Sequence, residues 1–218
     1  MEKQLENCSV EEKFFIHAIH QEVFNRVFPC IRHDLVGGIS ASLMRVSIME
    51  RRINKVELAP ELLKQDLEKI ELQLKENITS IRALQFWDFD SAQEDMPINV
   101  LNKSVHLMAS RLALRFIQTT VQAQEHNHIE PVQAKPLLFS LLCVFSYIED
   151  NDFDNHHLNV GQSGQSIYIK YEPKTAQDSA IKINRNLIFD QELVARFASY
   201  YNIDVNFAQN EIILVWKM

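Results

Sequence analysis

Two consecutive stretches of the chain carry apolar residues at the spacing of long helices that pack along one face. In Pro29–Asn54 these residues recur every three or four positions, at Leu35, Ile39, Leu43, Val46, Met49 and Ile53. In Glu61–Phe86 they recur at Leu63, Leu67, Ile70, Leu74, Ile78 and Ile81. This spacing is typical of helix seams of the coiled-coil type. A short turn that leads into Pro60, a residue suited to the first position of a helix, separates the stretches, so we expect an antiparallel helical hairpin.

A single hairpin of this kind cannot cover its own apolar stripe. Two hairpins that pair as a four-helix bundle can bury it, and the sequence therefore predicts a homodimer. We expect the first helix to begin near Val10, since Ser9 and Glu12 form a capping-box pattern. We also expect a kink or a short break at Pro29, and an end near Glu57.

His33 is the candidate catalytic residue of the first helix. It precedes Leu35 by two positions, about 200° around the helix, so its side chain should point away from the seam and into solvent. Asp34 is its neighbour, and an exposed histidine beside a carboxylate suits nucleophilic phosphoryl chemistry. From the residue types alone, an ordinary surface pair is the commoner explanation. Gly37 and Gly38 follow one turn later, and either helix packing or the approach of a partner could require them.

The rest of the chain predicts a second domain of mixed helices and strands. Trp87–Pro97 has the composition of a linker, which divides the chain into domains at 1–90 and 97–218. Apolar patterns predict the following elements: helices over Ile98–Gln124, Gln133–Ile148 and Phe189–Tyr201, and strands over Ser166–Tyr171, Ala180–Asn184, Ile203–Phe207 and Ile212–Trp216. The predicted fold class is therefore α+β: a helical hairpin that forms a dimeric four-helix bundle, followed by an α/β sandwich.

Charge and cysteine content exclude several classes of protein. A net charge of −7 disfavours a general nucleic-acid binder, which needs a basic surface. Three cysteines without paired spacing indicate a reducing compartment. The polar N-terminus does not resemble a signal peptide, and no apolar run reaches the roughly 20 residues of a membrane span. We therefore expect a cytoplasmic protein.

No motif predicts a metal or nucleotide of the chain's own. His126 with His128, and His156 with His157 near three aspartates, lack the spacing of metal ligands. The chain contains neither type of glycine-rich phosphate loop, and Gly161–Gly164 reads as a turn before a strand.

The order of these parts resembles the two-component histidine kinases. Arg32-His33-Asp34-Leu35 opens a long helix, an antiparallel helix follows, and an α/β sandwich completes the chain, as in the phosphotransfer and ATP-binding domains of that family. The resemblance covers nearly the whole chain in architecture but only a few residues in motif. It implies that His33 is the phosphoacceptor and Asp34 the adjacent acid.

The departures from the family pattern concern the nucleotide site. Kinases of this family carry Asn-Leu-Leu-x-Asn-Ala on a helix of the second domain, where the asparagines serve Mg-ATP. The corresponding stretch is Ser140-Leu141-Leu142-Cys143-Val144-Phe145, which keeps the two leucines and lacks both asparagines. The Asp-x-Gly-x-Gly motif and the glycine-rich lid are also missing, in agreement with only four glycines in the chain. The proline usual one turn after the histidine is replaced by the region of Gly37, where many of these kinases carry a polar residue used in dephosphorylation.

The pattern is instead similar to histidine phosphotransferases built on a kinase scaffold with a degenerate nucleotide domain. That resemblance implies a dimer that binds no ATP and has no cofactor of its own. It would carry a phosphoryl group on His33 between the aspartates of response-regulator receiver domains, which supply Mg²⁺. Two alternatives stay open: an active or regulatory kinase-like protein with an unusual ATP site, and a non-catalytic dimeric interaction protein.

Overall fold

The computed structural model describes residues 9–54, 60–84, 93–122, 129–151, 157–172 and 188–217. The chain forms two compact units. Residues 28–88 make one, which we call the hairpin unit, and residues 1–27 together with 89–218 make the other, the α/β unit. The first 27 residues of the predicted 1–90 domain thus lie in the same unit as the predicted 97–218 domain. The linker at Trp87 falls mostly outside the described residues.

Helix α2 (Val10–Ile53) supplies residues to both units, and its N-terminus has the predicted cap. The backbone N–H of Ser9 donates to Glu12 Oε2 over 2.7 Å, and the N–H of Glu12 donates to Ser9 Oγ over 3.2 Å. The predicted break at Pro29 is wrong, because α2 continues through it. A proline removes one helical hydrogen bond, but Val23, Val27 and Ile31 are buried on either side of it, and this burial holds the helix together.

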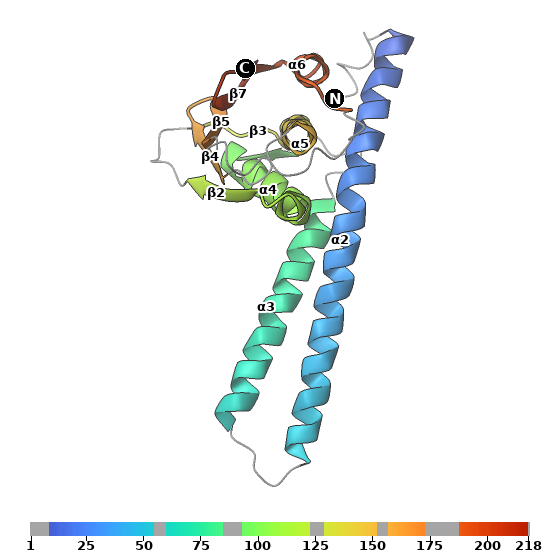
Figure 1. Cartoon of the computed structure of the whole chain (residues 1–218), viewed down its shortest axis with the longest axis vertical. Coiled ribbons are helices and arrows are strands. Elements are labelled where there is room, and N and C mark those ends of the chain that lie inside the picture. The colour runs from blue at the N-terminus through green and yellow to red at the C-terminus, as the bar shows by residue number, and fades with distance from the viewer. Residues whose placement is uncertain are drawn as a thin grey trace, which may run out of the picture. The chain divides into compact units, whose positions relative to one another are not determined.

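The hairpin unit consists of the second half of α2 and helix α3 (Pro60–Leu84), as Figure 1 shows. Gly38 lies against Asn77, and Arg52 donates to Asp66 over 2.5 Å, so the two helices are antiparallel, as predicted. The ends differ from the prediction by a few residues, since α2 ends at Ile53 and α3 at Leu84.

Apart from Ile31, the buried positions described in the hairpin unit are small or polar rather than aliphatic. They include Gly38, Ser42, Asp66, Asn77 and Ser80. Much of the predicted seam is instead on the surface of the single chain, where the following side chains are 41% to 64% exposed: Ile39, Leu43, Val46, Ile53, Leu67, Leu74, Ile78 and Ile81. One hairpin therefore leaves its apolar stripe uncovered.

The α/β unit contains a five-stranded mixed sheet and a two-stranded one. Its further helices are α4 (Pro97–Leu114), α5 (Ala134–Asp150) and α6 (Gln191–Ser199). Its strands are β1 (Glu94–Asp95), β2 (Gln118–Gln122), β3 (Val132–Gln133), β4 (His157–Ser163), β5 (Ser166–Glu172), β6 (Ile203–Phe207) and β7 (Glu211–Trp216). The large sheet has the order β2-β4-β5-β7-β6, with β2 parallel to β4 and the other pairs antiparallel, and β1 pairs with β3.

The predicted strands at β5, β6 and β7 and the helix at α6 are confirmed, but β1, β2, β3 and β4 were not predicted. The predicted helix Ile98–Gln124 is wrong beyond Leu114, because Gln118–Gln122 pairs with β4 as a strand. Its β-branched residues at 119–121 suit a strand better than a helix. Gly161 lies inside β4, and the turn before β5 is made at Gly164, whose φ is +56°. The predicted strand Ala180–Asn184 lies outside the described residues.

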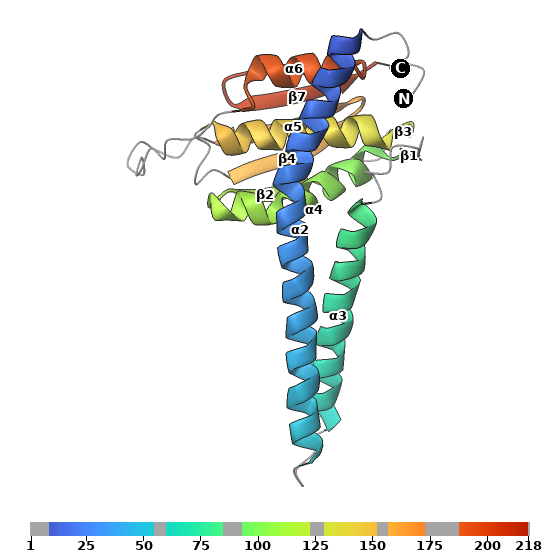
Figure 2. The ribbon, with the colours of Figure 1, turned by 90° about the vertical axis from the view of Figure 1, so that its right-hand side faces the viewer.

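The core of the α/β unit is centred on α5, of which every residue is buried. The first part of α2 packs against it and against α6, as Figure 2 shows. Ile16, Ile19, Val23 and Val27 are at most 5% exposed, and the His20 ring lies 4.2 Å from that of Phe139, centroid to centroid. Residues 10–27 therefore act as an additional helix of this unit.

His20 is a buried histidine whose titration should make the unit sensitive to acid. Burial, followed by the positive charges of Lys135 and His17, lowers its pKa to about 3. Above pH 6.5 the imidazole is neutral in both the folded and the unfolded chain. Below pH 6.5 only the unfolded chain readily takes up the proton, so stability is lost as the pH falls from 6.5 towards 3.

We expect the His20 contribution to lower the free energy of unfolding by about 2 kcal/mol between pH 7 and pH 5. Denaturant unfolding at both pH values measures it. His20→Phe, which keeps a ring but cannot titrate, should lose about 2 kcal/mol less than the wild type over the same interval. Identical pH dependence of the two proteins would contradict the prediction.

Candidate functional site

The structure places His33 on α2 in the hairpin unit, with its side chain 87% exposed. Its Nδ1 lies 3.3 Å from Oδ1 of Asp34, whose side chain is 48% exposed. The two predicted site residues are therefore adjacent in space as well as in sequence. Their catalytic role stays a prediction.

Three sides of α2 can be distinguished in the hairpin unit. The buried side carries Ser42, and His33 lies about 180° from it around the helix, so the imidazole points away from the interior. The exposed aliphatic residues Ile39, Leu43 and Val46 fall within about 60° of one another on a second side. His33 lies about 80° to 140° from them, on a third side.

The aliphatic residues of α3 continue the second side of α2. Ile39 follows the interior position Gly38 by one residue, and Ile78 likewise follows Asn77. In an antiparallel pair, equal offsets from the interior fall on the same side of the hairpin. We call this surface, made by Ile39, Leu43, Val46, Leu67, Leu74, Ile78 and Ile81, the aliphatic face. His33 lies outside it, so covering the aliphatic face would leave the imidazole accessible.

This arrangement gives the His33 imidazole the features of a nucleophile. When Nδ1 carries the proton and donates it to Asp34, the lone pair is on Nε2. An exposed Nε2 with a lone pair can attack an electrophilic phosphorus atom, and the carboxylate stabilises the positive charge that the ring acquires.

Helix α5 carries the stretch Ser140–Phe145, which the resemblance described above places at the nucleotide-binding motif of the kinases. Ser140, Leu141, Leu142 and Cys143 are each 0% exposed. The Ser140 hydroxyl donates to the backbone carbonyl of Pro136 over 2.9 Å, and burial raises the pKa of the Cys143 thiol. The side chains of this stretch therefore serve the core of the α/β unit.

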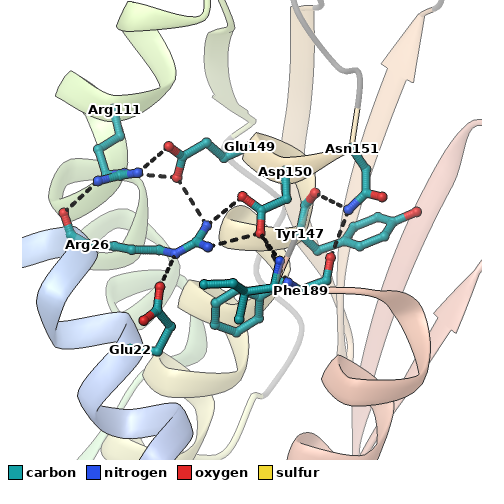
Figure 3. Close-up of polar contacts among 9 residues, drawn as sticks. Glu22, Arg26, Arg111, Tyr147, Glu149, Asp150, Asn151 and Phe189 are labelled. Carbon is teal, nitrogen blue, oxygen red and sulfur yellow. Dashed lines mark hydrogen bonds and ion pairs between the residues drawn. The ribbon is translucent and has the colours of Figure 1, made fainter. Parts of the chain in front are cut away.

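A buried cluster of charges, which was not predicted, joins α2 to α4 and α5 within the α/β unit (Figure 3). The Arg26 guanidinium donates to both carboxylate oxygens of Asp150, over 2.8 and 3.0 Å, and to Glu22 over 2.9 Å. Arg111 donates to both oxygens of Glu149 and to the backbone carbonyl of Arg26. The side chains of Arg26, Glu149 and Asp150 are 7% to 8% exposed.

Asp150 also holds the backbone that leads into α6. Its Oδ2 accepts the N–H groups of Ile188 and Phe189, over 3.2 and 3.0 Å. Burial opposes the charge on Arg26, but the bonds to Asp150 and Glu22 and the nearby carboxylates outweigh it and raise the pKa of the guanidinium. The sequence signal for this cluster was a single arginine, Arg26, which lies between the buried residues Val23 and Val27 on one face of the helix.

The structure also bears on metal ligands and membrane spans, in the part of the chain that it describes. In that part, no three His, Cys, Asp or Glu side chains are grouped so that they could hold a metal ion. His157 Nε2 lies 2.9 Å from the Thr120 hydroxyl, and His126, His128 and His156 fall outside the described residues. Among the described helices, none has the length and apolarity that crossing a bilayer requires.

No protein-family model matches the chain, and no curated protein matches it. Several solved structures do match the chain. The cytoplasmic segment of the histidine kinase QseC is 13% identical, with a TM-score of 0.43, over 60% of this chain and 80% of its own. The Acinetobacter baumannii histidine kinase AdeS is 14% identical, with a TM-score of 0.38, over 84% of this chain and 94% of its own.

A structure described as a bacterial phosphotransferase is 10% identical, with a TM-score of 0.40, over 89% of this chain and 95% of its own. At these identities the likeness concerns the fold alone. All three TM-scores are below 0.5, so the likeness carries no argument about this chain, whose own elements form a helical hairpin and an α/β unit with a mixed sheet.

Proposed function

We propose that the chain is a dimeric histidine phosphotransferase of two-component signalling. His33 takes a phosphoryl group from the aspartate of one receiver domain and passes it to the aspartate of another. The observation that carries this proposal is the position of His33: its side chain is 87% exposed, it lies beside Asp34, and it is outside the aliphatic face.

The transfer is an in-line displacement at phosphorus. Nε2 of His33 attacks the phospho-aspartate, a P–N bond forms, and the P–O bond to the receiver's carboxylate breaks. The Nδ1 proton stays on the ring and faces Asp34, which stabilises the cationic phospho-imidazole. Attack by the aspartate of a second receiver reverses each step, so the histidine returns to its starting state. Mg²⁺, which the receiver would hold, would neutralise charge on the phosphoryl oxygens.

The burial of α5 supports transfer without ATP. Nucleotide binding at this helix would need accessible polar side chains, and the stretch Ser140–Phe145 is enclosed in the core. The α/β unit would then serve as a docking or structural element.

The uncovered aliphatic face supports the dimer. A second copy of the same hairpin presents the same aliphatic face, and pairing two such faces gives a four-helix bundle that removes both from water.

Two alternative functions would give different labelling results. An active kinase would be distinguished by labelling of His33 from ATP, and a non-catalytic interaction protein by the absence of labelling from any source.

The test is transfer from phosphorylated receiver domains to the purified protein. We expect the wild type to take up the label and His33→Gln to stay at background, because glutamine has the size of histidine but no nucleophilic nitrogen. His106→Gln, at an exposed histidine of the α/β unit, is the matched control and should behave as the wild type. Equal labelling of His33→Gln and wild type, or labelling from ATP alone, would refute the proposal.

A further inference from the structure

The C-terminus of α4 places a phenylalanine where glycine is the usual residue. The backbone N–H of Ile117 donates to the carbonyl of Leu112, and that of Phe116 donates to the carbonyl of Ala113, both over 2.9 Å. This pair of bonds is the Schellman motif, which puts Phe116 in the left-handed region with a φ of +58°. Glycine adopts that region without steric strain, whereas a residue with a Cβ is strained there. Phe116 therefore holds backbone strain that a glycine would relieve.

The Phe116 side chain is not packed in the interior of the single chain. It is 73% exposed, and Leu114, two residues earlier, is 78% exposed. The apolar contact of the motif is made instead by Leu112 and Ile117, which are 1% and 4% exposed. Strain and an exposed ring at the same residue both disfavour the isolated chain, and burial of the ring against a partner would offset them.

The same unit contains a pocket of the size of an aromatic ring. Its volume is about 140 Å³, and its wall includes the apolar residues Ile129, Pro131, Val132 and Trp216. An apolar cavity of roughly 150 Å³ in another protein binds benzene. Glu130, which is exposed, also lines the pocket. The pocket can therefore accept a phenylalanine ring that has a basic group beside it.

The ring and the pocket lie at opposite ends of the large sheet. Phe116 precedes β2 by two residues, and Gln118 of β2 pairs with His157 at the start of β4. Gly164, which lines the pocket, directly follows Ser163 at the end of β4, a strand of 7 residues that spans about 20 Å. Figure 2 shows the same separation, with the C-terminal end of α4 on the left and β3 on the right. One chain therefore cannot place its own ring in its own pocket.

We propose that the Phe116 ring of one copy binds in the pocket of a second copy, so that copies associate head to tail through their α/β units. The charges beside the ring and the pocket are complementary. Residues 96–124, which contain α4 and β2, include three basic and no acidic residues, and Arg115 adjoins the ring, whereas Glu130 lies at the pocket. A contact between two different surfaces does not close on itself, so it can link hairpin dimers into larger assemblies.

Sedimentation velocity over a range of protein concentrations tests the association. The wild type should form species larger than the dimer as its concentration rises, and Phe116→Ala should lose them. Phe14→Ala is the matched control, because Phe14 is 71% exposed on α2 in the same unit, and it should associate as the wild type does. A wild type that never exceeds the dimer overturns the proposal, as does normal association of Phe116→Ala.

A glycine at position 116 separates the strain from the contact. Phe116→Gly should also lose the larger species, but its melting temperature should exceed that of Phe116→Ala by about 2–4 °C, since only glycine relieves the left-handed strain. Greater stability together with lost association supports the proposal that the ring is kept for the contact. Equal melting temperatures of the two variants would overturn that explanation of Phe116.

Mixing variants tests whether the contact is head to tail. Phe116→Ala keeps the pocket, and Val132→Trp, which fills the pocket, keeps the ring, so neither should associate alone. Their mixture should again form species larger than the dimer, because one variant supplies the ring and the other the pocket. A mixture that does not associate overturns the proposal, since the ring would then bind another surface.

A charge reversal at the pocket provides a second variant in case Val132→Trp does not fold. Glu130 is exposed, so Glu130→Arg should leave the fold intact. It would place two basic side chains opposite each other, at position 130 and at Arg115 of the second copy. We expect the association to weaken at least about tenfold. Unchanged association of Glu130→Arg would mean that the ring does not bind at this pocket.

Discussion

Replacing Arg26 with methionine is expected to lower the free energy of unfolding of the α/β unit by about 3–5 kcal/mol. Arg26 compensates two buried carboxylates: it makes a two-bond contact with Asp150 and lies 3.6 Å from Glu149. Methionine fills a similar volume but leaves Asp150 charged and buried, and its remaining donors in the described part of the chain are the backbone N–H groups of Ile188 and Phe189. Removing one member of a buried ion pair costs more than the pair contributes, because the remaining charge has lost its water.

Denaturant unfolding followed by the fluorescence of Trp216, which is 8% exposed on β7, measures this loss. Arg32→Met is the matched control on the same helix, since Arg32 is exposed, and its effect should stay within about 0.5 kcal/mol. The double variant Arg26→Met with Asp150→Asn should recover part of the stability, because the uncompensated charge is gone while one oxygen still accepts the backbone N–H groups. Equal losses at Arg26 and Arg32 would show that the cluster does not stabilise the unit.

The hairpin could be predicted from the sequence because its signal is local. The periodic apolar positions of residues 35–53 and 63–81 and the proline at 60 specify two helices and a turn without reference to the rest of the chain. The cap at Ser9 and the strands β5, β6 and β7 were predictable for the same reason, since each depends on a motif or an alternation of a few residues.

The contacts of residues 10–27 could not be predicted in this way. Their apolar positions predict a helix but do not specify its neighbour, and the neighbour is α5, more than 100 residues later. Strand β2 was missed because Gln118–Gln122 is stabilised by pairing with β4, a tertiary effect that overrides local preference. The charge cluster likewise joins Arg26 to Asp150, and no spacing rule connects such distant residues.

For the candidate site, the outward direction of His33 followed from helix geometry and agrees with its exposure. The packing requirement at Gly38 did not follow from the sequence, because it depends on where Asn77 of α3 lies, since a Cβ at position 38 would be 2.5 Å from Asn77 Oδ1. The polar interior of the hairpin was also missed: the seam residues were expected to pack between two hairpins, and no sequence pattern indicated that Ser42, Asp66 and Asn77 occupy buried positions within one.

Replacing Leu43 with glutamate is expected to convert the proposed dimer into a monomer at concentrations where the wild type is dimeric. Leu43 is 64% exposed in the single chain, so the change should cost the isolated hairpin little. In a bundle formed through the aliphatic face, each dimer would bury two of these carboxylates without partners. We expect the dissociation constant to rise at least about 100-fold, which corresponds to about 3 kcal/mol. Sedimentation velocity over a range of concentrations measures the shift.

Met44 provides a control of the same chemistry. It is also 64% exposed, but it lies about 100° further around α2, within about 20° of His33 and outside the aliphatic face. Met44→Glu should therefore remain a dimer. Equal dissociation of the two variants would mean that the dimer does not form through the aliphatic face, and two unchanged variants would mean that these helices do not form the dimer interface. If Leu43→Glu dissociates and Met44→Glu does not, although the two residues are equally exposed, the side of α2 that a second copy covers is identified. The side that carries His33 would then be open to a receiver domain.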